Sequence, residues 1–285
     1  MTTLTTTAPA VTTPPASRAG APAHSTFAGV MRGEWIKLLS LRSTWWTLAV
    51  TALLMALISL AAASSLGAMA DDPVMAPALA EMHGAEVISG GFQIAMLTIA
   101  MLGALFITGE YSTGMIRSTF AAVPTRLPVL AAKAIALVVL TTAVTLVGAV
   151  LAYVVTMPAL AEYDLVPPLD DPGTWRVLAG TVYFLVAAAL FSLGIGTLLR
   201  STAATVTLAL TVLLVLPGLL SFISLDWVET IVSYLPLPAS SAFIAAGGTS
   251  VRGVALSAQE GLVTIAAYAV VPLVAAAVTL RRRDA

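Results

Sequence analysis

The sequence has no cysteine and only two histidines, and these absences exclude several classes of site. Without cysteine there is no disulfide framework, no thiolate nucleophile and no Cys-ligated zinc or iron–sulfur centre. His24 and His83 both lie outside the long apolar runs, which excludes a metal site or proton relay built on histidine within those runs. Charge is also scarce, because Asp, Glu, Lys and Arg make up 9% of the chain, against roughly a quarter of a soluble domain. A formal net charge of −1 gives no basic field that would attract nucleic acid, so we expect no nucleic-acid partner.

Apolar residues are abundant instead: they make up 59% of the 285 residues, and the mean hydropathy is +0.99. A membrane-spanning helix needs about 20 mostly apolar residues. Six segments satisfy this requirement, and the second is the shortest: 45–69, 92–107, 134–157, 177–199, 203–223 and 262–280. The sequence therefore predicts an all-α integral membrane protein with six transmembrane helices.

The segments before the first apolar run differ from it in composition. Residues 1–26 are rich in Thr, Pro and Ala and have no apolar core of the kind found in a signal peptide. We predict a disordered cytoplasmic tail at 1–26, an amphipathic connecting helix at 27–44 and a six-span membrane domain at 45–285.

The distribution of charge around the six spans predicts their orientation. Short flanking segments that are rich in Lys and Arg stay in the cytoplasm. With the N-terminus inside, 11 of the 13 Lys and Arg residues are cytoplasmic, whereas 11 of the 14 acidic residues are external. The two external arginines are Arg176 and Arg252. We therefore predict a multi-pass protein of the cytoplasmic (inner) membrane with both termini in the cytoplasm.

The middle of every predicted span lacks Asp, Glu, Lys, Arg and His. A charged residue at the centre of a bilayer costs about 2.5–3.5 kcal/mol and is usually retained for function, so its absence disfavours ion-coupled transport and intramembrane catalysis. Neither lysine follows a glycine, as a P-loop requires: Lys37 follows Ile36 and Lys133 follows Ala132. We expect no enzyme activity and no cofactor in this chain, so the energy for any transport has to come from a partner.

The segment 27–42 has apolar residues at helical spacing, which predicts an interfacial amphipathic helix before the first span. Glu34 lies within the apolar arc, where a helix that only rests on a membrane would avoid a carboxylate. Two interpretations remain open. Glu34 either pairs with Lys37 or snorkels outward, or this face of the helix contacts another protein.

The segment 108–133 between the second and third spans is too long for a tight hairpin and should contain one short helix, with a break at Gly114. Anchoring of the adjoining spans at the cytoplasmic side explains Arg126 and Lys133. It does not explain Glu110, whose negative charge is opposite to the excess of positive charge on that side. We expect Glu110 to pair with Arg117 or Arg126, or to contact a soluble partner.

Helix-breaking and small residues occur within the spans. Pro217, which precedes Gly218, and Pro272 would each kink a helix, either as a tolerated feature of packing or as a hinge. Gly194 and Gly196 would allow helices to approach closely. The external segment 226–246 is apolar enough to dip back toward the membrane.

The pre-span sequence RGEWIKLLSLRSTWW, the loop sequence GEYSTGMIRSTFAAVPTRLPVLAAK and the long external segment before the last span together resemble a known family. They are similar to permease subunits of ATP-binding-cassette (ABC) transporters of the type-2 exporter family, specifically the six-span bacterial half-permeases. The resemblance covers nearly the whole chain after the tail.

This resemblance implies a permease without ATPase activity that pairs with a second copy or a related permease. It also implies that a cytoplasmic ATP-binding cassette subunit, which binds the ATP, docks on the first cytoplasmic loop, and that short external re-entrant helices lie between spans 5 and 6. The residues that match the coupling region are Glu110, Tyr111, Gly114, Arg117, Pro124, Arg126 and Lys133, and those that match the connecting helix are Glu34, Lys37 and Arg42.

The leading hypothesis is therefore an ABC-type exporter permease that moves an apolar or amphipathic substrate across the cytoplasmic membrane. Two alternatives belong to other classes. One is a membrane anchor or immunity protein that does not transport, and the other is an ion-coupled secondary transporter.

Overall fold

The computed structural model describes residues 26–244 and 256–282, and within these ranges the chain is all-α, without strands. The predicted tail lies outside the described residues except for Thr26. The connecting helix is present as α1 (Phe27–Ser40), and the Thr26 side chain caps it by accepting a hydrogen bond from the Gly29 N–H at 3.2 Å.

Six helical segments of the described chain are long and apolar enough to cross a membrane, which makes this a multi-pass membrane protein and confirms the predicted number of spans. Several of them are composed of consecutive helices. In chain order they are α2 (Arg42–Ser64) with α3 (Leu66–Asp71), α5 (Gly84–Ser89) with α6 (Phe92–Ser112), α8 (Leu127–Glu162), α9 (Pro172–Leu199), α10 (Thr202–Leu210) with η1 (Thr211–Val215) and α11 (Leu216–Leu220), and α14 (Ala258–Arg282).

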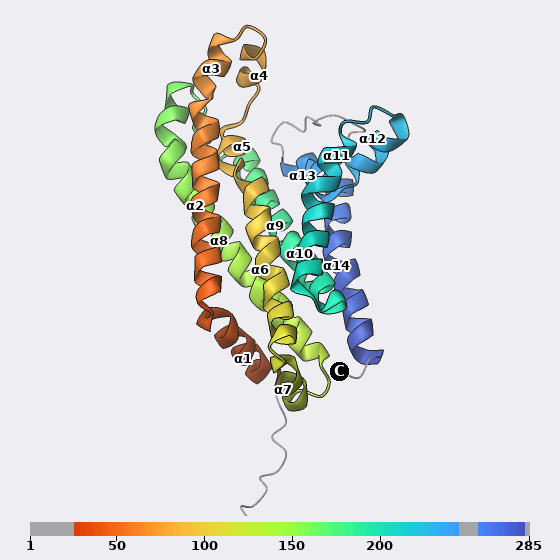
Figure 1. Ribbon diagram of the computed structural model, residues 1–285. Helices are drawn as coiled ribbons and strands as arrows, with labels where there is room; N and C mark the ends of the chain where they lie inside the picture. The colour runs from red at the N-terminus through yellow and green to blue at the C-terminus, as the bar shows by residue number, and fades with distance from the viewer. Residues whose placement is uncertain (1–25, 245–255, 283–285) are drawn as a thin grey trace, which may run out of the picture.

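The remaining short helices lie at the two ends of the bundle (Figure 1). We call these the α7 end and the α4 end. The α7 end carries α1, α7 (Met115–Ala122) and the last turn of α14, and the α4 end carries α4 (Ala76–Ala80), α12 (Asp226–Ser233) and α13 (Pro236–Ile244). Because α1 and the end of α14 share one end, the chain crosses the bundle an even number of times.

The second span is not the shortest, contrary to the prediction. With α5 it covers 29 residues, whereas the fifth span covers 19. The prediction counted only the uninterrupted apolar run and stopped at the Gly90–Gly91 pair. The helix α5 is nevertheless largely buried, because it packs between α2, α8 and α9.

Two central helices, α6 and α9, form the core of the bundle. Their most apolar stretches are 56% and 67% buried, whereas those of the fifth and sixth spans are only 22% buried. A Cβ atom added to Gly103 of α6 would lie 2.4 Å from the Ala189 carbonyl oxygen of α9, so only glycine permits this approach. The fifth and sixth spans therefore leave broad apolar faces uncovered within the described chain.

The prolines within the spans have different effects on the backbone. The π-helical turn η1 directly precedes α11, whose second residue is Pro217, and the ring nitrogen of this proline has no hydrogen to donate to the preceding turn. In contrast, α14 continues through Pro272, and α8 continues through Pro158, where the sequence analysis had ended the third span. Gly194 packs against Pro272, as expected for a small residue at a helix crossing.

The predicted short helices between the last two spans are present as α12 and α13. Of these, α13 packs back against α9 and α14, and Arg176 on α9 donates hydrogen bonds to the carbonyl oxygens of Phe243 and Ala242 at 3.3 and 3.4 Å. A guanidinium at the last carbonyls of a helix stabilises its end. The last two residues of the predicted segment, and Arg252, lie outside the described residues.

Candidate functional site: a buried charge network at the α7 end

The loop between the second and third spans contains a single short helix, α7, as predicted. Gly114 separates α6 from α7 and has φ = +73°, a left-handed conformation that glycine adopts without steric cost. On α7, Ile116 and Phe120 are buried against the bundle, whereas Met115, Arg117 and Ser118 are exposed. The helix thus lies against the bundle and presents a polar outer face.

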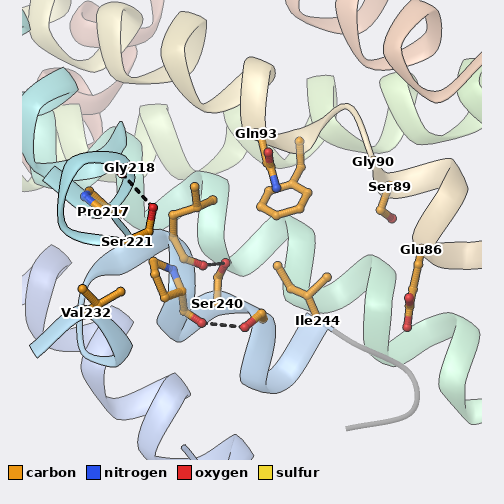
Figure 2. A pocket seen from close by; sticks show the side chains of 14 residues that line it. Glu86, Ser89, Gly90, Gln93, Pro217, Gly218, Ser221, Val232, Ser240 and Ile244 are labelled. Carbon is orange, nitrogen blue, oxygen red and sulfur yellow. Dashed lines mark hydrogen bonds between the residues drawn. The ribbon is translucent and has the colours of Figure 1, made fainter. Parts of the chain in front are cut away.

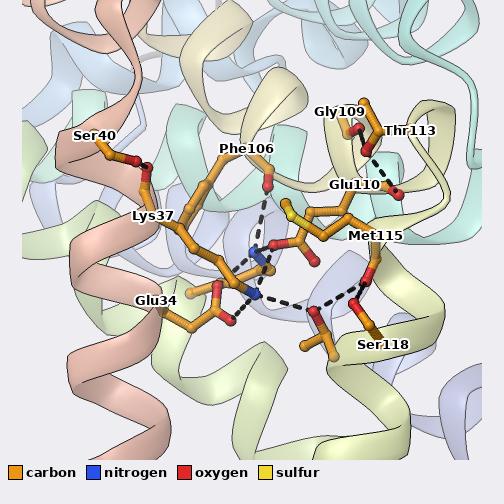
Figure 3. A network of polar contacts seen from close by, with 11 residues as sticks. Glu34, Lys37, Ser40, Phe106, Gly109, Glu110, Thr113, Met115 and Ser118 are labelled. Carbon is orange, nitrogen blue, oxygen red and sulfur yellow. Dashed lines mark hydrogen bonds and ion pairs between the residues drawn. The ribbon is translucent and has the colours of Figure 1, made fainter.

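Four charged side chains meet beneath α7, and we call them the buried charge network: Glu34 and Lys37 of α1, Glu110 of α6 and Lys133 of α8 (Figure 3). Lys133 is 0% exposed, Glu34 2% and Glu110 4%. Two carboxylates and two ammonium groups balance in charge, which is a condition for keeping ions out of water.

Both ammonium groups have a full set of hydrogen-bond acceptors. Lys133 Nζ donates to Glu34 Oε2 at 2.6 Å, to Glu110 Oε1 at 2.8 Å and to the Phe106 carbonyl oxygen at 3.4 Å. It also lies 4.1 Å from the centre of the Phe106 ring, a favourable position for a cation. An ammonium group has three hydrogens, so the hydrogen-bonding capacity of Lys133 is filled.

Lys37 connects the network to α7. Its Nζ donates to Glu34 Oε1 at 2.8 Å, to Glu110 Oε1 at 3.0 Å and to Thr119 Oγ1 of α7 at 3.0 Å. Burial disfavours the ammonium form, but the hydrogen bonds and charges of Glu34 and Glu110 outweigh it and raise the pKa of Lys37 above its ordinary value. The network therefore joins α1, α6, α7 and α8 at one point.

These contacts show which residues pair with the two glutamates, whereas a contact of either glutamate with another protein stays a prediction. Glu34 pairs with Lys37, as one interpretation held, and also with Lys133, which the sequence analysis did not foresee. The expected pairing of Glu110 with Arg117 or Arg126 is wrong, because its ion pairs are to Lys37 and Lys133. Arg126 instead lies over the Phe120 ring, 5.4 Å from its centre, and donates to the Leu280 carbonyl oxygen at 3.5 Å.

The other residues that match the family lie around this network. Tyr111 and Arg117 line a cavity at the start of α7, Pro124 is exposed in the turn after α7, and Arg42 is exposed at the start of α2. Lys133 was attributed to anchoring of the third span, yet it is completely buried. The signal that could have identified its role was the presence of two acids, Glu34 and Glu110, on the side of the chain that is rich in positive charge.

A second cavity, of about 520 Å³, lies near the α4 end between α5–α6 and α11–α13 (Figure 2). Its wall is mainly apolar, with a few polar groups that include Gln93 and Ser89. Ser89 is 2% exposed and its hydroxyl has no hydrogen-bond partner among the described residues. Pro217 and Gly218 form the opposite wall (Figure 2). A mainly apolar cavity with few polar groups suits an amphipathic ligand.

One histidine pairs with an acid at the α4 end. His83 Nδ1 accepts from the Ala85 N–H at 3.2 Å, so Nε2 carries the proton and donates to Asp171 Oδ2 at 2.8 Å. Hydrogen bonds from the Gly173 backbone and from His83 lower the pKa of Asp171. Since Asp171 also caps α9, this contact fixes the start of α5 against the start of α9.

Comparison with known proteins does not assign a family. No protein-family model matches the chain, and no curated protein matches its sequence. Across the residues that the structure describes, no group of three or more His, Cys, Asp or Glu side chains could hold a metal ion. The features of this protein that bear on its function are the six spans, the buried charge network and the two cavities.

Proposed function

We propose that this protein is the membrane-spanning permease subunit of an ABC-type exporter and that a separate ATP-hydrolysing subunit docks at the α7 end. The observation that carries the proposal is the buried charge network, which ties α7 to α1, α6 and α8. The resemblance of the segments 27–42 and 108–133 to ABC permeases supports it, because the network is built from these two segments.

In this proposal the buried and the exposed residues at the α7 end have different roles. Glu34, Glu110 and Lys133 are buried and would act by holding the helices together. The exposed face of α7, with Met115, Arg117 and Ser118, would contact the ATPase. A displacement of α7 would then move α6, α8 and α1 together, because breaking the network would leave charges buried without partners.

In this proposal the α7 end faces the cytoplasm. Lys and Arg residues flank the spans at that end, and most acidic residues lie at the other, as the positive-inside rule requires. The exposed apolar faces of the fifth and sixth spans are available to lipid and to a second permease subunit. The cavity at the α4 end would hold the apolar or amphipathic cargo late in its passage.

Copurification tests the docking step. We expect the full-length protein, extracted in mild detergent from its own membranes, to retain a subunit that carries a P-loop. Met115→Asp on the exposed face of α7 should reduce this retention, and Val74→Asp, at an exposed position outside the spans in the turn before α4, is the matched control. Retention that is equal in both variants, or absent from the unaltered protein, would reject the proposed docking surface.

Ion-coupled secondary transport is a second candidate, and one observation favours it. Glu110 is buried, and its Oε2 has no hydrogen-bond partner among the described residues, so this oxygen is available to a coupling ion. Transport in cells would separate the candidates. Abolition by ATP depletion but not by an ionophore supports the exporter, and the opposite result supports ion coupling.

A further inference from the structure

We propose that the cavity at the start of α7 binds the phosphate group of an anionic membrane phospholipid. The cavity has a volume of about 460 Å³ and is lined by residues from the end of α6 and the start of α7, together with Arg200 from the turn after α9. Its wall includes the arginines Arg117 and Arg200 and the hydroxyl-bearing residues Tyr111 and Ser112, and none of the described residues that line it is an acid. This inference does not depend on the proposed transport function.

The positive charge in this cavity is not neutralised by the described part of the protein. Neither Arg117 nor Arg200 forms an ion pair there, and Nε of Arg200 is buried without a hydrogen-bond partner. Glu110, the acid nearest to Arg117 along the chain, forms its ion pairs with Lys37 and Lys133 through Oε1. A buried guanidinium nitrogen without an acceptor is costly, and a phosphate oxygen would satisfy it.

Arg200 is held in position before any ligand arrives. It lies at the end of α9 with φ = +55°, in the two-residue turn that leads into α10. Its guanidinium lies over the Tyr111 ring, 5.2 Å from the ring centre. A cation that is already oriented loses less side-chain freedom when it binds an anion. The cavity thus offers an anion one guanidinium that is held in place, that of Arg200, and one that is exposed, that of Arg117.

The depth of the cavity points to a lipid rather than to a soluble phosphate. Tyr111 and Ser112 are the last residues of the second span, and Arg200 directly follows the fourth. Lipid headgroups lie at the ends of membrane spans, where arginines attract those that are anionic. The exposed side chain of Leu199, the last residue of the fourth span, lies next in sequence to Arg200 and would contact the acyl chains.

Native mass spectrometry of the full-length protein in detergent would test the inference, with phosphatidylglycerol as the anionic probe, phosphatidylcholine as the neutral one and inorganic phosphate as the soluble one. We expect one phosphatidylglycerol to be retained in preference to phosphatidylcholine. The double variant Arg117→Gln/Arg200→Gln should weaken that retention about tenfold or more, because it removes two charge-assisted contacts. Arg32→Gln, at an exposed position on α1, is the matched control and should retain the lipid.

Ser112→Asp provides a second variant that keeps both arginines. Ser112 is exposed and lines the cavity, so a carboxylate there should occupy the guanidinium groups and displace the lipid from a folded protein. Retention of phosphatidylglycerol that is unchanged in both variants would overturn the inference. Binding of inorganic phosphate that depends on both arginines, without competition by phosphatidylglycerol, would assign the site to a soluble phosphate and overturn the lipid assignment. Loss of a bound protein partner with unchanged lipid retention would assign the cavity to an acidic side chain of that partner, which also overturns it.

Discussion

Replacing Lys133 by methionine should destabilise the protein strongly, because it leaves buried negative charge without a partner. The substitution removes ammonium contacts of 2.6 Å to Glu34 and 2.8 Å to Glu110, both of which remain buried. Breaking a buried ion pair on one side typically costs 3–5 kcal/mol, and we expect a loss of about that size. Methionine fills a similar volume, so the loss reports charge rather than a cavity.

Two further variants make this prediction specific. Lys37→Met removes the ammonium group of a side chain that is 29% exposed. Water can reach this side of the network and solvate the carboxylates that remain, so we expect a loss of stability of about 1 kcal/mol. Glu110→Gln/Lys133→Met restores a balance of one carboxylate and one ammonium group. It should therefore be more stable than the sum of the single effects predicts, by about 1–3 kcal/mol.

The free energy of unfolding can be measured in mixed micelles by titration with a denaturing detergent, followed by circular dichroism. The chain has no cysteine, so a cysteine pair introduced between α1 and α8 would report separately whether α1 remains docked. Equal destabilisation by Lys133→Met and Lys37→Met, or strict additivity in the double variant, would refute the reasoning that the network is held together by buried charge.

Three further predictions concern other parts of the molecule. Because folding raises the pKa of Lys37, the stability that its ammonium group contributes is fully present below the ordinary pKa of 10.5 and is lost as the pH rises through the raised pKa. The free energy of unfolding should therefore fall in this alkaline range, and it should fall less in Lys37→Met. Gly194→Ala would place a Cβ 2.7 Å from the Pro272 Cβ and should lower the stability by about 1–3 kcal/mol. The added Cβ in Gly33→Ala meets only open space, so this substitution should stabilise α1 by up to about 1 kcal/mol. Thermal unfolding measures both effects. Gly218→Leu should fill part of the cavity at the α4 end and reduce transport. It should not lower the melting temperature, because a Cβ at this position meets no atom within 4 Å. Unchanged transport would show that the cargo does not pass through this cavity.

Much of the architecture could be predicted from the sequence because a bilayer leaves few options for an apolar chain. Length and hydropathy predicted six spans, helical periodicity predicted α1, and the length of the segment 108–133 predicted one short helix, which is α7; all of these are present. The break at Gly114 was predicted because glycine commonly interrupts helices, and the structure shows that Gly114 adopts the left-handed conformation. The exact ends of the spans were less predictable from the sequence. The second span begins before the Gly90–Gly91 pair, and α8 continues through Pro158, although such residues usually interrupt helices.

The partners of the charged residues could not be predicted in the same way. Lys133 lies 99 residues from Glu34 in the chain, and the two are brought together only by the packing of α1 on α8. Glu110 is closer in sequence to Arg117, but Gly114 turns the chain between them, and Arg117 lies in the wall of a different cavity. The sequence therefore singled out Glu34 and Glu110 as unexpected acids, whereas tertiary packing determined that they pair with Lys133.

Site-specific photocrosslinking from α7 tests the central claim most directly. A photoreactive residue at Ser118, on the exposed face of α7, is compared with one at Phe222, which is 86% exposed near the α4 end. The proposed function predicts that position 118 crosslinks in native membranes to a protein whose peptides include a P-loop, and that position 222 does not. The absence of such a crosslink from position 118, or an equal yield from both positions, would contradict an exporter driven by an ATPase docked on α7.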